Sequence, residues 1–96
     1  MTAIQRLQHW FIANCDGDWE HGMGITISTL DNPGWLIDIN VEGTALAGII
    51  KSPTAVDRGL NNWLHASCDG NVFRLRCGPS NLEEALLLFL NLAESP

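Results

Sequence analysis

The stretch Asn61-Asn62-Trp63-Leu64-His65-Ala66-Ser67-Cys68-Asp69-Gly70-Asn71-Val72-Phe73-Arg74-Leu75-Arg76-Cys77 carries the clearest structural signal in the chain. Apolar and polar residues alternate on both sides of Asp69-Gly70, and Asp-Gly between such segments is a strong signal for a two-residue type I′ hairpin turn. That turn predicts an apolar and a polar set of cross-strand pairs: Leu64 with Leu75 and Ala66 with Phe73, then Trp63 with Arg76 and His65 with Arg74.

The residues before this hairpin predict a helix and further strands. Residues 2–15 place apolar side chains three and four residues apart, which is typical of an amphipathic helix, and Thr2 with Gln5 forms a potential capping box. From residue 21 the period becomes two, and Asp31-Asn32-Pro33-Gly34 has turn chemistry. Glu42-Gly43 predicts a second two-residue turn. That turn would set Ile39 opposite Leu46, Ile37 opposite Gly48 and Trp35 opposite Ile50.

Two further segments complete the pattern. Residues 51–60 lose periodicity and contain Pro53 and Gly59, so we expect a loop there, with one helical turn at most. Residues 85–92 are apolar nearly all round, which predicts a C-terminal helix buried on more than one side. Its outer leucines would need cover from the first helix or from a second copy of the protein: Leu87, Leu88 and Leu92.

These elements predict one α+β domain over residues 1–96, with an N-terminal helix, about five strands in an antiparallel meander sheet, and a C-terminal helix. We expect both helices on one face, because antiparallel sheets often bury one face and leave the other in water. The predicted apolar face carries Ile25, Ile27, Ile37, Ile39, Leu46, Ile50, Leu64, Phe73 and Leu75. The predicted open face carries Thr26, Ser28, Asp38, Asn40, Trp63, His65, Arg74 and Arg76. A sheet curled toward a barrel is the alternative.

Charge and composition limit the classes of partner. The chain has 11 acidic and 5 basic residues and a net charge of −6. This argues against nucleic acid or an anionic membrane as the partner and fits a basic protein. No apolar run is long enough to span a bilayer, and the first residues do not read as a signal peptide, so we expect a cytoplasmic protein. Three cysteines, an odd number, fit reduced thiols.

The densest group of chemically active side chains is Cys15-Asp16-Gly17-Asp18-Trp19-Glu20-His21, between the first helix and the first strand. A calcium loop would need Gly at its sixth position and Glu at its twelfth, where the chain has His21 and Ile27. The spacing of Cys15 and His21 matches no zinc site. We therefore expect no metal and no cofactor.

Three interpretations of this cluster remain. Asp16, Asp18, Trp19, Glu20 and His21 would bind a partner protein, the carboxylates meeting a basic surface and the indole acting as an aromatic anchor. Alternatively, Glu20 or His21 would serve a small enzyme as general acid or base, although no nucleophile or phosphate loop accompanies them. In the structural interpretation, the residues end a helix, fill the core and start a strand. A second candidate recognition patch lies on the predicted open face: Trp63, Arg74 and Arg76.

The cluster, followed by Gly24-Ile25-Thr26-Ile27 and Thr29-Leu30-Asp31-Asn32-Pro33-Gly34-Trp35, resembles the immunity protein 53 (Imm53) family of bacterial polymorphic toxin systems. The resemblance covers residues 5–93. It implies a small cytoplasmic protein that neutralises a cognate toxin by binding it, without catalysis. The leading expectation is therefore a non-enzymatic inhibitor of a toxin that we expect to be basic. The alternatives are a small enzyme using Glu20 and His21, and a homodimeric scaffold protein.

Overall fold

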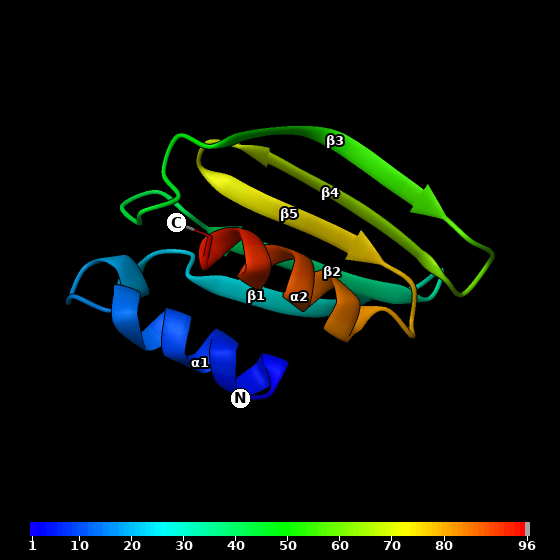
Figure 1. Ribbon diagram of the computed structural model, residues 1–96, viewed down its shortest axis with the longest axis horizontal. Helices are drawn as coiled ribbons and strands as arrows, with labels where there is room; N and C mark the ends of the chain where they lie inside the picture. The colour runs from blue at the N-terminus through cyan, green and yellow to red at the C-terminus, as the bar shows by residue number, and fades with distance from the viewer. Residues whose placement is uncertain (96) are drawn as a thin grey trace.

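The computed structural model describes residues 1–95 and shows two helices packed against a five-stranded antiparallel sheet (Figure 1). The predicted α+β class, with one helix at each end of the chain, is confirmed. In chain order the elements are α1 (Ala3–Asn14), the 3₁₀ turn η1 (Trp19–His21), β1 (Ile25–Leu30), β2 (Gly34–Asn40), β3 (Ile50–Asp57), β4 (Trp63–Asp69), β5 (Val72–Cys77) and α2 (Leu82–Ala93).

The strand order is β1-β2-β5-β4-β3, so the predicted meander is wrong. β2 pairs with β5, and β3 lies at the far edge beside β4, which also corrects the prediction of a loop at residues 51–60. The residues of β3 explain this position, because they are exposed along nearly the whole strand and include Pro53. Proline cannot donate to a ladder, so it is confined to edge strands. The more apolar β5 takes the central place.

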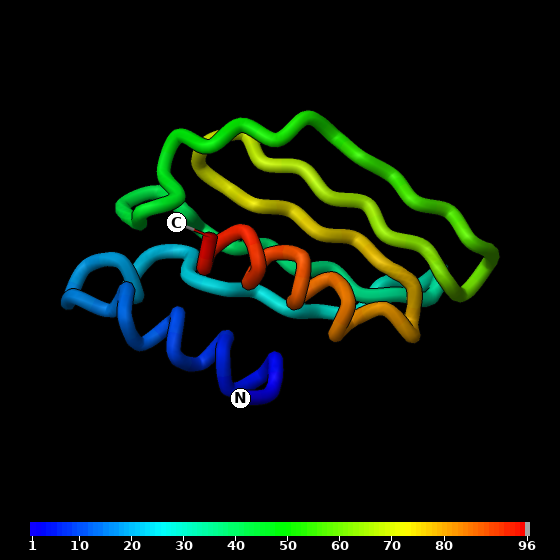
Figure 2. The backbone as a smooth tube through the Cα atoms, in the orientation of Figure 1, coloured from blue at the N-terminus to red at the C-terminus, as the bar shows by residue number. Residues whose placement is uncertain are grey.

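Residues 41–49 form a crossing loop in place of the predicted hairpin at Glu42-Gly43 (Figure 2). The Val41 N–H donates to the carbonyl of Asn71 at 2.9 Å, and the Gly48 N–H donates to that of Gly70 at 3.0 Å. These bonds carry the chain past the turn between β4 and β5 to the opposite edge of the sheet. The cross-strand pairs predicted for the hairpin do not form, and Ile50, expected in the core, is 71% exposed.

The hairpin of β4 and β5 forms with a register two residues away from the predicted one. Asp69 causes the shift, because its Oδ1 accepts hydrogen bonds from the backbone N–H groups of Asn71 (2.9 Å) and Val72 (2.8 Å). The turn becomes Gly70-Asn71, with φ of 95° at Gly70, which suits the first position of a type II′ turn. A shift of two keeps every side chain on its predicted face. The pairs become Leu64 with Cys77, His65 with Arg76, Ala66 with Leu75 and Ser67 with Arg74.

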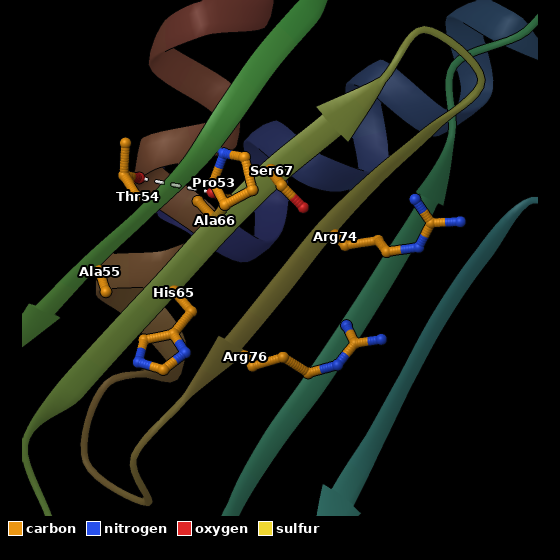
Figure 3. Close-up of a pocket in the computed structure, with 8 residues that line it drawn as sticks. All are labelled: Pro53, Thr54, Ala55, His65, Ala66, Ser67, Arg74 and Arg76. Atoms are coloured by element: carbon orange, nitrogen blue, oxygen red, sulfur yellow. Dashed lines mark hydrogen bonds between the residues drawn. The ribbon is translucent and has the colours of Figure 1, made fainter.

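The core lies between the sheet and both helices. Phe89 of α2 is fully buried and packs edge-on against Phe73 of the sheet (ring centroids 5.3 Å apart) and Trp10 of α1 (5.0 Å). Figure 3 looks onto the opposite face of the sheet, with both helices behind it, as predicted. The outer leucines of α2 are partly buried against this core: Leu87, Leu88 and Leu92. The cysteines are free thiols, and Cys68 and Cys77 are buried without facing each other.

Candidate functional site

The loop between α1 and β1, residues 15–22, is held by two of its own carboxylates. Asp16 Oδ1 accepts hydrogen bonds from the backbone N–H groups of Asp18 (2.9 Å) and Trp19 (3.0 Å). The Glu20 carboxylate accepts from the N–H groups of Asp16 (2.9 Å) and Gly17 (2.8 Å). Gly17 has a φ of 95°, a conformation that other residues rarely adopt. Asp16 and Glu20 therefore shape this loop as well as charging it.

Hydrogen bonds to a carboxylate favour its ionised form. Bonds from the backbone N–H groups of Trp19 and then Asp18 lower the pKa of Asp16. Backbone hydrogen bonds, first from its own N–H and next from that of Asp16, lower the pKa of Glu20. Both side chains are consequently ionised at neutral pH, and the loop carries fixed negative charge.

Trp19 lies in the protein core rather than on the surface. The residue is 7% exposed, and its ring packs against those of Trp10 and Phe11, with centroids 5.6 Å apart in each case. The indole N–H donates to the carbonyl of Asn40 at 3.2 Å. The indole is thus not presented as an exposed anchor. It joins the loop to α1 and to the end of β2, as in the structural interpretation of the sequence.

A hollow of about 290 Å³ lies beside this loop, where the loop meets the end of β2. Asp18 and Glu42 are both exposed and reach the hollow from two separate loops. The Asn40 N–H donates to the carbonyl of Gly24 at 2.8 Å, which fixes the end of β2 beside the start of β1. Sequence patterns gave no sign that Glu42 belongs to this site, because its closeness to Asp18 depends on the pairing of β2 with β1. The full lining is Asp16, Asp18, Trp19, Gly22, Asn40, Glu42 and Gly43.

Ion pairs concentrate the net charge at this end of the molecule. Four of the five basic side chains are paired with carboxylates: Arg6 with Glu94, Arg58 with Glu84, Arg74 with Asp69 and Arg76 with Asp38. Of the 11 acidic side chains, the other seven have no basic partner within residues 1–95. Four of these seven belong to the loop and its hollow: Asp16, Asp18, Glu20 and Glu42.

The open face of the sheet carries the second predicted patch. A hollow of about 250 Å³ lies there, lined in part by His65, Arg74 and Arg76, which Figure 3 labels. Arg74 donates to Asp69 at 2.9 Å and holds the pKa of that carboxyl far below its usual range. Arg76 donates to Asp38 Oδ1 at 2.8 Å and to the carbonyl of its neighbour Leu75 at 2.9 Å. Both guanidinium groups are therefore bound within the protein.

Trp63 lies on the same face but not opposite Arg76, so the predicted pair of these two residues is wrong. Its ring packs on His65 instead, with centroids 5.2 Å apart, and its cross-strand neighbour is Asp57. The cause is the two-residue change of register between β4 and β5. A role for Trp63, Arg74 and Arg76 in binding a partner stays a prediction.

The loop and its hollow present negative charge and a concave surface, and they do not bring Glu20 and His21 together as an acid and a base. Glu20 is engaged by the loop backbone, and the hollow beside the loop is lined neither by Glu20 nor by His21. Within residues 1–95, no three His, Cys, Asp or Glu side chains are grouped so that they could hold a metal ion. No helix of the described part is long and apolar enough to cross a membrane.

Comparison with known proteins gives one informative result. No curated protein and no solved structure matches the chain. Residues 4–94 match the family described as immunity protein 53 (Imm53), and this range includes the acidic loop, all five strands, the whole of α2 and all of α1 except Ala3. This chain belongs to the immunity protein 53 family.

Proposed function

We propose that this protein neutralises a basic cognate toxin in the cytoplasm by docking it on the acidic end, which consists of the loop 15–22 and Glu42. Membership of the immunity protein family implies toxin neutralisation, typically without catalysis. The observation that supports this surface is the gathering of four of the seven unpaired carboxylates at one end. Such a concentration of negative charge accelerates the encounter with a cationic partner and orients it.

The residues of the acidic end divide into two groups by what their side chains contact. Asp16 and Glu20 hold the loop in shape, so the surface is organised before a partner arrives, and this lowers the entropic cost of binding. Asp18 and Glu42 are exposed, and the bonds that hold the loop leave their carboxylates available. We assign the direct contacts with toxin lysine and arginine side chains to these two, with the exposed His21 at the rim.

The test compares two double variants that change the net charge equally. Asp18→Asn with Glu42→Gln removes the contacts, while Asp31→Asn with Glu83→Gln removes two exposed carboxylates elsewhere. The ligand is the purified toxin domain encoded beside this gene, with its active site inactivated. We expect the first variant to weaken binding by about 2–5 kcal/mol, because desolvated charges of the toxin lose their partners. The control variant should change only the association rate and its salt dependence.

The comparison has one outcome that contradicts the proposal. If both double variants bind the toxin with the affinity of the unmodified protein, the acidic end lies outside the interface. Circular dichroism and thermal melting check that both variants are folded before binding is measured. Glu20 is left unchanged in this test, because its replacement would disturb the loop and mix a structural effect with the loss of charge.

A further inference from the structure

The two edges of the sheet differ in how they are protected. β3 carries Lys51, Pro53 and Asp57, and its register with β4 is interrupted between Lys51 and Thr54. Charges, proline and irregular pairing are the features that keep an exposed edge from pairing with another strand. β1 has none of them: its sequence is Ile25-Thr26-Ile27-Ser28-Thr29-Leu30, and it pairs with β2 without a break.

The backbone of β1 offers unused hydrogen-bonding groups on its outer side. The bond from the Asn40 N–H to the Gly24 carbonyl marks these two residues as a hydrogen-bonded pair. Such pairs alternate along an antiparallel ladder, so the groups that point toward β2 belong to Thr26, Ser28 and Leu30. The outward N–H and C=O groups belong to Ile25, Ile27 and Thr29. Within residues 1–95, no backbone bond beyond the ladder engages them.

Exposed apolar surface gathers in the same part of the chain. Nine large hydrophobic side chains are exposed in the described residues, and six of them precede Ser28: Met1, Ile4, Phe11, Ile12, Met23 and Ile27. Ile27 lies at the centre of β1 on the helix side of the sheet and is 40% exposed. At Ile27, the core-facing side of β1 is therefore partly uncovered at this edge.

We propose that β1 is a dimerisation strand that pairs antiparallel with β1 of a second copy of this chain. In the two-fold register, Ile27 faces Ile27 and Ile25 faces Thr29. All three outward N–H groups of each strand then meet the three outward carbonyls of the other. On the helix side the two Ile27 side chains bury each other, and on the open side Thr26 faces Ser28, which is a favourable cross-strand pair.

The charge distribution favours a second copy as the occupant of this edge. β1 is uncharged in a chain of net charge −6, so it offers a basic toxin no electrostatic attraction. Two acidic copies repel each other least where neither carries charge. In the proposed register, Gly24 of one copy lies opposite Leu30 of the other. The two acidic ends are then separated by roughly 20 Å along the strands and stay available to toxin.

Charge complementation at residue 27 tests the register. Ile27→Lys places two lysines face to face at the two-fold axis, and Ile27→Glu places two glutamates there. Each variant alone should sediment as a monomer, while their equimolar mixture should form the heterodimer. The unmodified protein should be dimeric at concentrations on the order of 100 µM, which corresponds to a modest binding free energy. Ala55→Lys on β3 is the matched control, and it should dimerise like the unmodified protein.

Disulfide formation gives a second measurement. In a Cys15→Ser background, Ile27→Cys should cross-link on mild oxidation, because Cα atoms of a hydrogen-bonded pair lie about 5.5 Å apart, within disulfide range. Ala55→Cys on β3 should not cross-link. The proposal is overturned if the unmodified protein is monomeric at this concentration or if the Lys and Glu variants do not associate. It is equally overturned if the Ile27 variants lose toxin binding without any change in self-association, since β1 would then receive a toxin strand.

Discussion

Replacing Trp19 with Phe separates a structural role of this residue from a direct role in toxin binding. Trp19 is 7% exposed, and its indole packs against Trp10 and Phe11 and donates one hydrogen bond to the carbonyl of Asn40 at 3.2 Å. Phenylalanine keeps most of the ring contacts but removes the N–H donor and leaves space where the larger ring was. We expect the variant to fold and to be less stable.

The expected loss follows from these contacts. One neutral hydrogen bond contributes about 0.5–1.5 kcal/mol to stability. The smaller ring leaves a small cavity, which costs about 1 kcal/mol more. The sum is about 2 kcal/mol for Trp19→Phe. Trp19→Ala would cost about 3–5 kcal/mol, a large part of the ~5–10 kcal/mol expected for a domain of this size, and would not give a clean comparison.

Urea denaturation followed by far-ultraviolet circular dichroism measures the free energy of unfolding. Toxin affinity is then measured at a temperature where both proteins are fully folded. We expect reduced stability and an affinity within about threefold of the unmodified protein. A variant that keeps its stability would show that the indole is not part of the core. A variant with the expected stability but more than tenfold weaker binding would show that the indole contacts the toxin directly.

Two further predictions concern the loop and the centre of the sheet. The folded-state pKa values of Asp16 and Glu20 are lowered, so the stability that these groups provide is complete above about pH 5 and is lost as the pH falls through the folded-state pKa values. Glu20→Gln should therefore flatten the fall of the unfolding free energy between about pH 5 and pH 2. An unchanged pH dependence would contradict this prediction. Gly34→Ala would place a Cβ against the Cys77 carbonyl oxygen and 3.1 Å from the Trp63 ring, so β2 and β5 would have to separate. We expect the free energy of unfolding, measured by urea denaturation, to fall by about 3 kcal/mol. The control variant Gly22→Ala should lose far less stability, because its Cβ would meet only the Trp19 carbonyl oxygen at 3.6 Å.

Local patterns predicted both helices, the strands β1, β2, β4 and β5 and the face that their side chains take, but neither β3 nor the order of the strands. Alternation in β2, β4 and β5 sorted Ile37, Ile39 and Leu75 onto the buried face, and the two-residue shift at Asp69 preserved that assignment. The hairpin predicted at Glu42-Gly43 was a plausible local solution. It was displaced because β5 buries Phe73 and Leu75 beside β2, whereas β3 would have brought Pro53 to a central position. That competition involves residues more than 30 positions apart in the chain.

At the candidate site too, the sequence predicts the local cluster of residues but not the contacts that depend on residues far along the chain. The acidic cluster is visible in the sequence, but composition does not reveal that Asp16 and Glu20 turn their oxygens toward the loop backbone. Burial of Trp19 depends on Trp10 and on the end of β2, and the approach of Glu42 to the loop depends on the pairing of Asn40 with Gly24. Sequence reasoning therefore identified the loop and left open which of its side chains are available to a partner.

Arginine side chains neutralise carboxylates elsewhere on the surface by forming ion pairs, whereas the carboxylates of the acidic end have no basic partner within the described residues. Arg74 and Arg76 lie on the open face and bind Asp69 and Asp38, so positive and negative charge cancel there. The Arg74–Asp69 pair is exposed, and exposed pairs add little to stability. In the docking that we propose, the larger effect of both pairs is electrostatic. Each pair removes a positive charge that would repel a basic toxin and a negative charge that would attract it to a face other than the acidic end. Four of the seven acidic side chains left without a basic partner in residues 1–95 lie in the loop 15–22 or at Glu42, and such a concentration of negative charge favours one orientation of approach by the basic toxin that we propose.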